Sequence, residues 1–241
     1  MFPRAIIREV VRPTRRLYQQ SIGLAARSEQ PYATHLPVLV GVAAAFSPAS
    51  VIEFGSGIFS TLSFLDDLAF PTLKSTESYE NNREWFEQIR AQIPPGGRVS
   101  LRFIDGKMYR AVNDAKVETA GMIFIDDSPT ARARVPTVEA VARQCGSKPI
   151  VVLHDNDLWR LRIATRKFEH CVSFAAFNPQ CCVMWHGHPE WRKVIENVAA
   201  IARRHAGGIP VTHARAWREV FSRDLCELNK PENRSERSFI L

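Results

Sequence analysis

The sequence predicts an α/β fold: a doubly wound, mostly parallel seven-stranded sheet with an antiparallel C-terminal hairpin and helical appendages at both ends. Two observations predict it. From residue 51 onward, apolar runs typical of buried strands alternate with segments of helical periodicity. The last two apolar runs are separated only by Asn178, Pro179 and Gln180, a connection too short for a crossover helix, so these two strands must be antiparallel.

The apolar runs predict strands at residues 50–54, 72–77, 98–103, 121–125, 149–153, 171–177 and 181–186. Helical spacing predicts helices at residues 34–47, 60–69, 80–93, 131–145, 157–168 and 189–206. Gly146 and the pair Gly207-Gly208 stand where the helices 131–145 and 189–206 should end. This alternation is typical of a Rossmann-like sheet covered on both faces by helices.

The chain is expected to have three parts: a basic helical N-terminal arm (1–30), a central domain (31–208) and a C-terminal extension (209–241). Its net charge is +7, to which residues 1–30 contribute +4 and residues 203–241 contribute +3, so the centre is neutral. A neutral centre argues against a nucleic-acid substrate. The basic ends can be solvated helix faces, contacts within a homo-oligomer, or contacts with an anionic partner.

Composition also suggests where the protein works. The longest apolar run, residues 36–46, is too short for a transmembrane segment, and we find no secretory signal pattern. The five cysteines are an odd number without the spacing of a disulfide framework. We therefore expect a cytoplasmic protein with reduced thiols.

The segment from Val51 to Thr61 is the strongest motif. It reads as a buried strand ending after Glu53, a turn containing Gly55, Ser56 and Gly57, and the start of a helix that Ser60 or Thr61 can cap. Glycine lets a backbone turn tightly and pass close to a bound nucleoside. The motif therefore predicts a nucleoside site at the carboxyl end of the first strand.

Acidic and polar residues follow most of the other predicted strands. In a doubly wound sheet, ligands bind at the carboxyl ends of the strands. Glu77, at the end of the second predicted strand and followed by Ser78, can accept hydrogen bonds from both ribose hydroxyls of an adenosine. Asp105 and Gly106 follow the third strand, where they can either meet the adenine amino group or form an ordinary Asp-Gly turn.

These features resemble class I S-adenosylmethionine-dependent methyltransferases over about residues 34–187. The resemblance lies in the glycine motif, the second-strand acid, Asp126 after the fourth strand, and the terminal hairpin. It implies S-adenosylmethionine as the cofactor. The cofactor-binding residues that it implies are Glu53, Gly55, Ser56, Gly57, Ser60, Thr61, Glu77, Ser78, Asp105, Gly106 and Asp126.

A narrower resemblance concerns Asp126, Asp155 and Asn156. The catechol O-methyltransferases end their fourth strand in Asp and their fifth in Asp-Asn, and those side chains hold a divalent metal. The resemblance implies Mg²⁺ bound by these three residues, with Asp126 and Asp155 acting in catalysis. His154 offers an alternative without metal, because a histidine can itself remove a hydroxyl proton.

The function expected from the sequence is methyl transfer from S-adenosylmethionine, with the hydroxyl of a small molecule or sugar as acceptor. Two alternatives stay open: an NAD-dependent oxidoreductase, and a catalytically inactive Rossmann-like binding protein. The identity of the acceptor does not follow from the sequence, because acceptor pockets are built from variable loops.

Overall fold

The structure is a computed structural model that describes residues 31–128, 130–228 and 230. The predicted arm 1–30 and most of the tail beyond residue 228 lie outside the described residues. The described chain forms one seven-stranded sheet with the order β3-β2-β1-β4-β5-β7-β6. Its strands are β1 (Ser50–Phe54), β2 (Ser75–Glu80), β3 (Val99–Phe103), β4 (Met122–Ile125), β5 (Ile150–Leu153), β6 (His170–Phe174) and β7 (Cys181–Trp185).

The strand directions confirm the predicted fold class. β1 pairs in parallel with both β2 and β4, and the parallel arrangement continues to β3 and β5 at the two sides. β7 runs antiparallel to both β5 and β6, as the short connection predicts. The chain order reverses between β1 and β4, which is the switch point where doubly wound sheets bind ligands.

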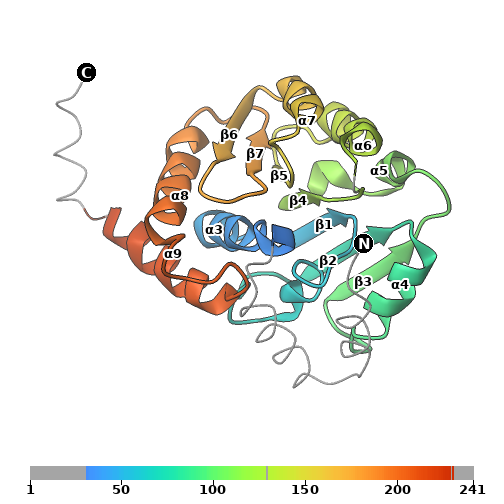
Figure 1. Cartoon of the computed structure of the whole chain (residues 1–241), viewed down its shortest axis with the longest axis horizontal. Helices are drawn as coiled ribbons and strands as arrows, with labels where there is room; N and C mark the ends of the chain where they lie inside the picture. Colours follow the sequence, from blue (N-terminus) through green and yellow to red (C-terminus); the bar gives the residue numbers. More distant parts are fainter. Residues whose placement is uncertain (1–30, 129, 229, 231–241) are drawn as a thin grey trace.

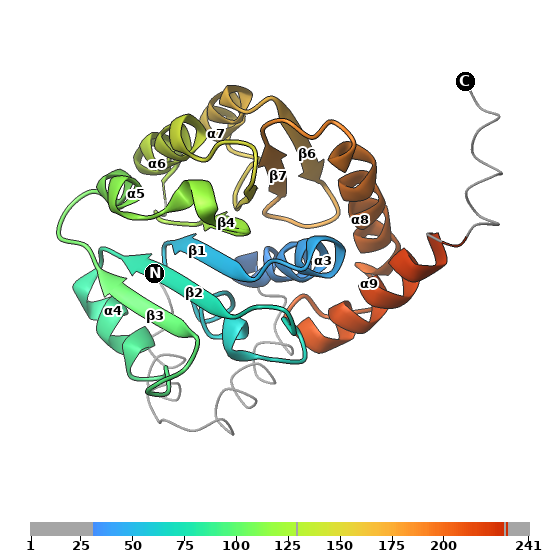
Figure 2. The same ribbon diagram turned by 180° about the vertical axis from the view of Figure 1, so that it is seen from behind.

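Helices cover both faces of the sheet, as Figures 1 and 2 show from opposite sides. Alternate side chains of each central strand enter two separate apolar cores. Phe124 and Val152 face one core, together with α3 (Leu36–Phe46), α8 (Trp191–His205) and α9 (Ala214–Leu228). Ile125 and Leu153 face the other, with α5 (Ala111–Asp114), α6 (Ala131–Gln144) and α7 (Trp159–Ala164). This two-sided burial explains why the strands read as continuous apolar runs.

The C-terminal extension contributes to the core up to Leu228. Trp217 and Phe221 of α9 are fully buried, and α9 packs against α3. At Gly41 of α3, an added Cβ would come within 2.6 Å of Val198 on α8 and 2.8 Å of Phe221, so glycine permits this close helix packing. Within the described part of the chain, none of the helices has the length and apolarity needed to cross a membrane.

Two predicted elements differ from the structure. In place of the helix at 60–69 there are turns and one 3₁₀ helix, η2 (Ser63–Leu65), so Ser60 and Thr61 do not cap an α-helix. The second strand was predicted at 72–77 but runs over Ser75–Glu80, because its pairing with β1 and β3 continues three residues further. α4 (Arg83–Arg90) follows it, capped by Asn82, whose side chain accepts a hydrogen bond from the backbone of Trp85.

Candidate active site

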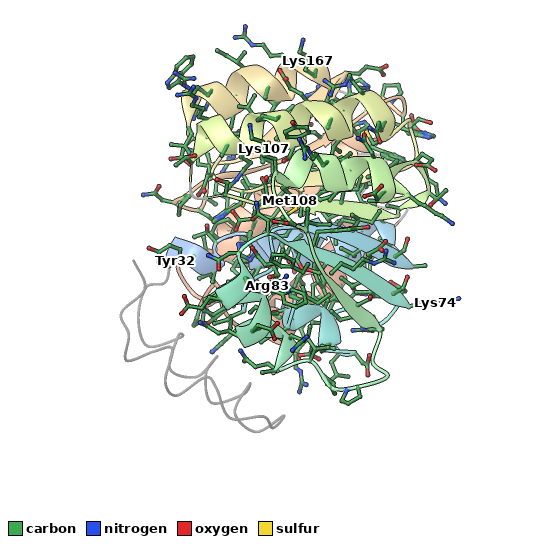
Figure 3. The ribbon with its side chains drawn as sticks, turned by 90° about the vertical axis from the view of Figure 1, so that its right-hand side faces the viewer. Tyr32, Lys74, Arg83, Lys107, Met108 and Lys167 are labelled. Atoms are coloured by element: carbon green, nitrogen blue, oxygen red, sulfur yellow. The ribbon has the colours of Figure 1, made fainter. Side chains whose placement is uncertain are left out.

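The candidate site lies at the carboxyl edge of the parallel strands. Since β2, β1, β4 and β5 are adjacent and parallel, the residues that follow them meet along one edge. Figure 3 shows the two edges on opposite sides of the molecule: Tyr32 lies at the carboxyl edge, and Lys74, which directly precedes β2, lies at the amino edge. Polar side chains from the segments after these strands form two groups, one beside β1 and β2 and one beside β4 and β5.

Gly55 adopts a left-handed backbone conformation, with φ of +92°. A Cβ added here would lie 2.3 Å from the backbone oxygen of Asp126, so a side chain would collide with the chain that follows β4. The glycine is therefore required by the neighbouring backbone. A Gly55→Val substitution would disturb the fold itself and is unsuitable as a test of ligand binding.

Glu80 is the acidic residue that ends β2, and the sequence interpretation missed it. Its carboxylate is buried, and it accepts hydrogen bonds from the backbone nitrogen of Ser56 at 3.1 Å and from the Ser56 hydroxyl at 2.9 Å. Its other oxygen accepts from the backbone nitrogens of Asn81 at 2.9 Å and Asn82 at 2.7 Å. Burial raises the pKa of Glu80 above its ordinary value despite these bonds. Glu80 thus joins the end of β2 to the glycine turn.

Glu77 lies inside β2 rather than at its end. Its carboxylate pairs with Arg102 on the neighbouring strand β3 at 2.6 Å. The structure therefore corrects the predicted position of Glu77 at the strand terminus. A spacing argument could have located Glu80, because Asn82 is a good helix cap and marks the end of the strand two residues earlier.

Glu53 forms a buried network with polar side chains that the sequence grouped as cofactor-binding, through one of its two carboxylate oxygens. Thr61 donates to the carboxylate at 2.6 Å, Ser78 on β2 also donates to it, and the backbone nitrogen of Gly57 donates to the Thr61 hydroxyl at 2.9 Å. Burial raises the pKa of Glu53 to about 7, although the hydroxyls of Ser60, Ser78 and Thr61 oppose the shift. These hydrogen bonds fix the conformation of the glycine turn after β1.

Asp105 and Gly106 lie in the exposed loop after β3. The backbone oxygen of Gly106 accepts a hydrogen bond from the side chain of Asn81 at 2.9 Å. This bond links the loop after β3 to the segment after β2. Of the predicted cofactor-binding residues, Ser56 bonds directly to Glu80, and Gly106 is linked to it through Asn81.

The second group is organised by Arg134, a buried residue of α6. Its guanidinium pairs with Asp126 at 2.6 Å and with Asp155 at 3.0 Å, and it donates to the backbone oxygen of His154 at 3.0 Å. Burial alone would raise the pKa of Asp126, but Arg134 and His154 outweigh it and lower that pKa to about 2.

Two of the residues predicted to hold Mg²⁺ pair with a guanidinium in this arrangement. The Arg134 guanidinium lies between the carboxylates of Asp126 and Asp155, where a metal would have to bind. The side-chain nitrogen of Asn156 donates to Ser173 on β6 at 3.2 Å, and its side-chain oxygen, the atom that a metal would need, is buried without a hydrogen-bond partner. The Mg²⁺ site stays a prediction, and Arg134 already neutralises the two carboxylates in this arrangement.

His154 is buried, and both of its ring nitrogens have partners. The Thr34 hydroxyl donates to the backbone oxygen of Pro179 at 2.9 Å and lies 2.9 Å from Nε2 of His154. Nδ1 lies 3.2 Å from the ionised Asp126. Burial opposes a charge here, but Asp126 raises the pKa of His154 above its ordinary value. The protonated form of His154 can donate on both sides, to Thr34 through Nε2 and to Asp126 through Nδ1.

His35 is the neutral counterpart of His154. Its ring is buried against Phe124 and meets the His154 ring edge-on, with 4.9 Å between the ring centres in each pair. Burial and the neighbouring His154 lower the pKa of His35 to about 3. One donor atom from each of His35, Asp126 and His154 lies within 4.8 Å of the others. Donor atoms this close together can share a metal ion, although Asp126 also pairs with Arg134.

Comparison with solved structures agrees with the fold. A probable spermidine synthase from Corynebacterium glutamicum is 15% identical, with a TM-score of 0.52 over 77% of this chain and 75% of that one. Human methyltransferase-like protein 13, solved in complex with SAH, is 14% identical, with a TM-score of 0.50 over 76% of this chain and 94% of that one. No protein-family model and no curated protein matches the sequence. The chain thus has the Rossmann-like fold found in S-adenosylmethionine-dependent methyltransferases, and the likeness extends to the fold alone.

Proposed function

We propose that the protein is an S-adenosylmethionine-dependent methyltransferase that acts on the hydroxyl of a small molecule or sugar. The buried Glu80 carboxylate, at the end of β2 and bonded to the turn after β1, is the observation that supports it most strongly. In doubly wound sheets an acid at this position accepts hydrogen bonds from ribose hydroxyls. The nucleoside would lie between Glu80 and the Asp105-Gly106 loop, and the cofactor would supply an electrophilic methyl group.

The group around Arg134 would form the acceptor side. The side chains of Asp126 and Asp155 are about a quarter exposed, at 25% and 23%, while Arg134 and His154 behind them are buried. The two carboxylates can therefore accept hydrogen bonds from an incoming hydroxyl group, which orients its oxygen toward the methyl carbon. Positioning of this kind lowers the barrier by removing orientational freedom before reaction.

His154 can remove the hydroxyl proton of the acceptor only when its own ring is unprotonated. In its protonated form, His154 donates from both ring nitrogens and cannot accept a proton. It becomes a base after losing its own proton, and its raised pKa places that loss toward alkaline pH. With His154 as the base, we predict that methyl transfer accelerates as pH rises and needs no metal ion.

Ligand binding to two matched variants tests the cofactor site. We expect Glu80→Gln to weaken S-adenosylhomocysteine binding about tenfold, because a neutral amide replaces a charged acceptor of two hydroxyls. Glu77→Gln, three residues away in the same strand, should bind as the wild type does, because Glu77 pairs with Arg102. Isothermal titration calorimetry measures both. The reverse pattern would return the ribose role to Glu77, as the sequence first indicated.

The same titration separates the alternatives. An NAD-dependent oxidoreductase would bind NAD in preference to S-adenosylhomocysteine, and that result would overturn the proposal. A catalytically inactive binding protein would bind S-adenosylhomocysteine but transfer no methyl group to any hydroxyl acceptor. A radiolabelled methyl-transfer screen over phenols, sugars and lipids distinguishes it from an enzyme.

A further inference from the structure

The outer face of α7 carries an unusual concentration of exposed apolar side chains. Among the described residues, five large hydrophobic side chains are exposed, and Leu158, Trp159 and Ile163 lie within six positions of one another. Trp159 is 64% exposed and Ile163 is 51% exposed. The two are four positions apart on the helix, so they share a face. The opposite face, with Leu161 and Ala164, is buried in the core.

Cationic side chains border these apolar residues. Residues 157–167 contain four Arg or Lys and a single acid, Asp157. Arg160, Arg166 and Lys167 are exposed, and the Arg160 guanidinium lies 4.9 Å from the centre of the Trp159 ring. Figure 3 shows Lys167 on the outer surface at the top of the molecule. We call Leu158, Trp159, Arg160, Ile163, Arg166 and Lys167 the α7 face.

We propose that the α7 face docks on an anionic lipid surface. Tryptophan is favoured at the boundary between lipid and water, and aliphatic side chains gain free energy by entering the acyl region. The flanking Arg and Lys side chains are attracted by anionic headgroups. Charge complementarity alone would also fit a nucleic acid, but the exposed leucine and isoleucine gain nothing from a phosphate backbone. The combination therefore favours lipid.

The α7 face adjoins the candidate active site. Leu158 follows Asp155 by three residues, and the backbone oxygen of Asn156 accepts a hydrogen bond from Arg162 at 3.0 Å, which ties the start of α7 to the end of β5. Docking through this face would hold the carboxyl edge of the sheet close to the membrane. The inference does not depend on methyl transfer, because lipid binding is measured without cofactor or acceptor.

Co-sedimentation of the full chain with vesicles tests the proposal. We expect binding to mixed phosphatidylcholine–phosphatidylglycerol vesicles and much weaker binding to phosphatidylcholine alone. Combined Trp159→Ser and Ile163→Ser substitutions should weaken binding about tenfold, since both apolar side chains leave the interface. Combined Arg160→Gln and Arg166→Gln substitutions should weaken it about fivefold per charge. Added salt should weaken the wild type as well.

Leu68→Ser provides the matched control. Leu68 is 63% exposed but lies in the segment between η2 and β2, away from α7, so its substitution should leave vesicle binding unchanged. Circular dichroism checks that every variant is folded. Residues 1–30 carry a net charge of +4 and can attract anionic vesicles without α7. The comparison of variants, and not binding by the wild type alone, therefore shows whether the α7 face binds lipid.

Three outcomes would overturn the proposal. One is the absence of binding to anionic vesicles, and another is equal binding by the wild type and the Trp159→Ser, Ile163→Ser protein. The third is a different occupant of the α7 face, either a second copy of this chain, seen by light scattering, or RNA, seen by gel shift. In that case the same two substitutions would abolish the dimer or the RNA complex while vesicle binding persists.

Discussion

The two halves of the carboxyl edge treat acidic side chains in opposite ways. Beside β1 and β2, Glu53 and Glu80 are buried among neutral donors, hydroxyls and backbone nitrogens, and their pKa values are raised. Beside β4 and β5, Asp126 and Asp155 pair with a buried guanidinium, and the pKa of Asp126 falls to about 2. Burial favours the neutral form of the acids in both halves. The lower pKa of Asp126 therefore comes from Arg134, the cation that α6 supplies.

This difference suits two kinds of ligand group. A carboxylate held only by neutral donors can exchange one of them for a ribose hydroxyl without leaving a buried cation unpaired. A carboxylate that neutralises a buried arginine is committed to that partner, because breaking the pair leaves an uncompensated charge. We therefore expect the hydrogen bonds of the first half to change when a ligand binds. The ion pairs of the second half should stay in place while its carboxylates position the acceptor.

Removing the cation should have the largest effect. Arg134→Met leaves Asp126 and Asp155 facing each other without their buried partner, and we expect the free energy of unfolding to fall by about 3–5 kcal/mol. Arg132→Met, an exposed arginine in the same helix, should change it by less than about 0.5 kcal/mol. Denaturant unfolding measures both.

A combined variant sharpens that result. Adding Asp126→Asn and Asp155→Asn to Arg134→Met removes the unpaired charges, so part of the lost stability should return. A loss with no recovery in the combined variant would mean that Arg134 acts through packing, and that the contrast between the two halves is not electrostatic.

Glu53 and Asp126 should also respond oppositely to pH. The folded protein holds the Glu53 proton up to about pH 7, against 4.5 ordinarily, so the free energy of unfolding falls as pH rises through this window, by up to about 3 kcal/mol. Asp126 has a lowered pKa, about 2 against 3.8, so its contribution of about 2 kcal/mol is present above pH 3.8 and is lost as pH falls toward 2.

Denaturant unfolding across this pH range measures both contributions. Glu53→Gln should flatten the dependence between pH 4.5 and 7, and Asp126→Asn should flatten it only below pH 3.8. Some slope near neutrality should survive in Glu53→Gln, since burial also raises the pKa of Asp127 to about 7. Identical profiles for the two variants would contradict the assignment of the two groups.

Metal removal should have the smallest effect. Because Arg134 already supplies the positive charge between Asp126 and Asp155, neither EDTA nor added Mg²⁺ should shift the melting temperature of the wild type. Differential scanning fluorimetry measures this. In Arg134→Met the two carboxylates lose that cation, so Mg²⁺ should raise the melting temperature of this variant only. An EDTA-sensitive wild type would restore the metal site that the sequence indicated.

The sequence by itself determined the features that depend on near neighbours in the chain. The glycine turn after β1, the alternation of apolar strands with helices, and the antiparallel final strand all follow from local spacing, because short connections and backbone conformations have few solutions. The positions of Asp126 and Asp155 after their strands were likewise readable, since the apolar runs that precede them end clearly.

Only the tertiary structure decided which acids face which partners. The position at which β2 ends depends on its pairing with β1 and β3. This position makes Glu80, and not Glu77, the acid at the strand terminus. One ring nitrogen of His154 contacts Thr34, which lies 120 positions earlier in the chain. Arg134 became the centre of the acidic pair because α6 folds back over the ends of β4 and β5. Burial and long-range contacts set these interactions, and neither is encoded in local spacing.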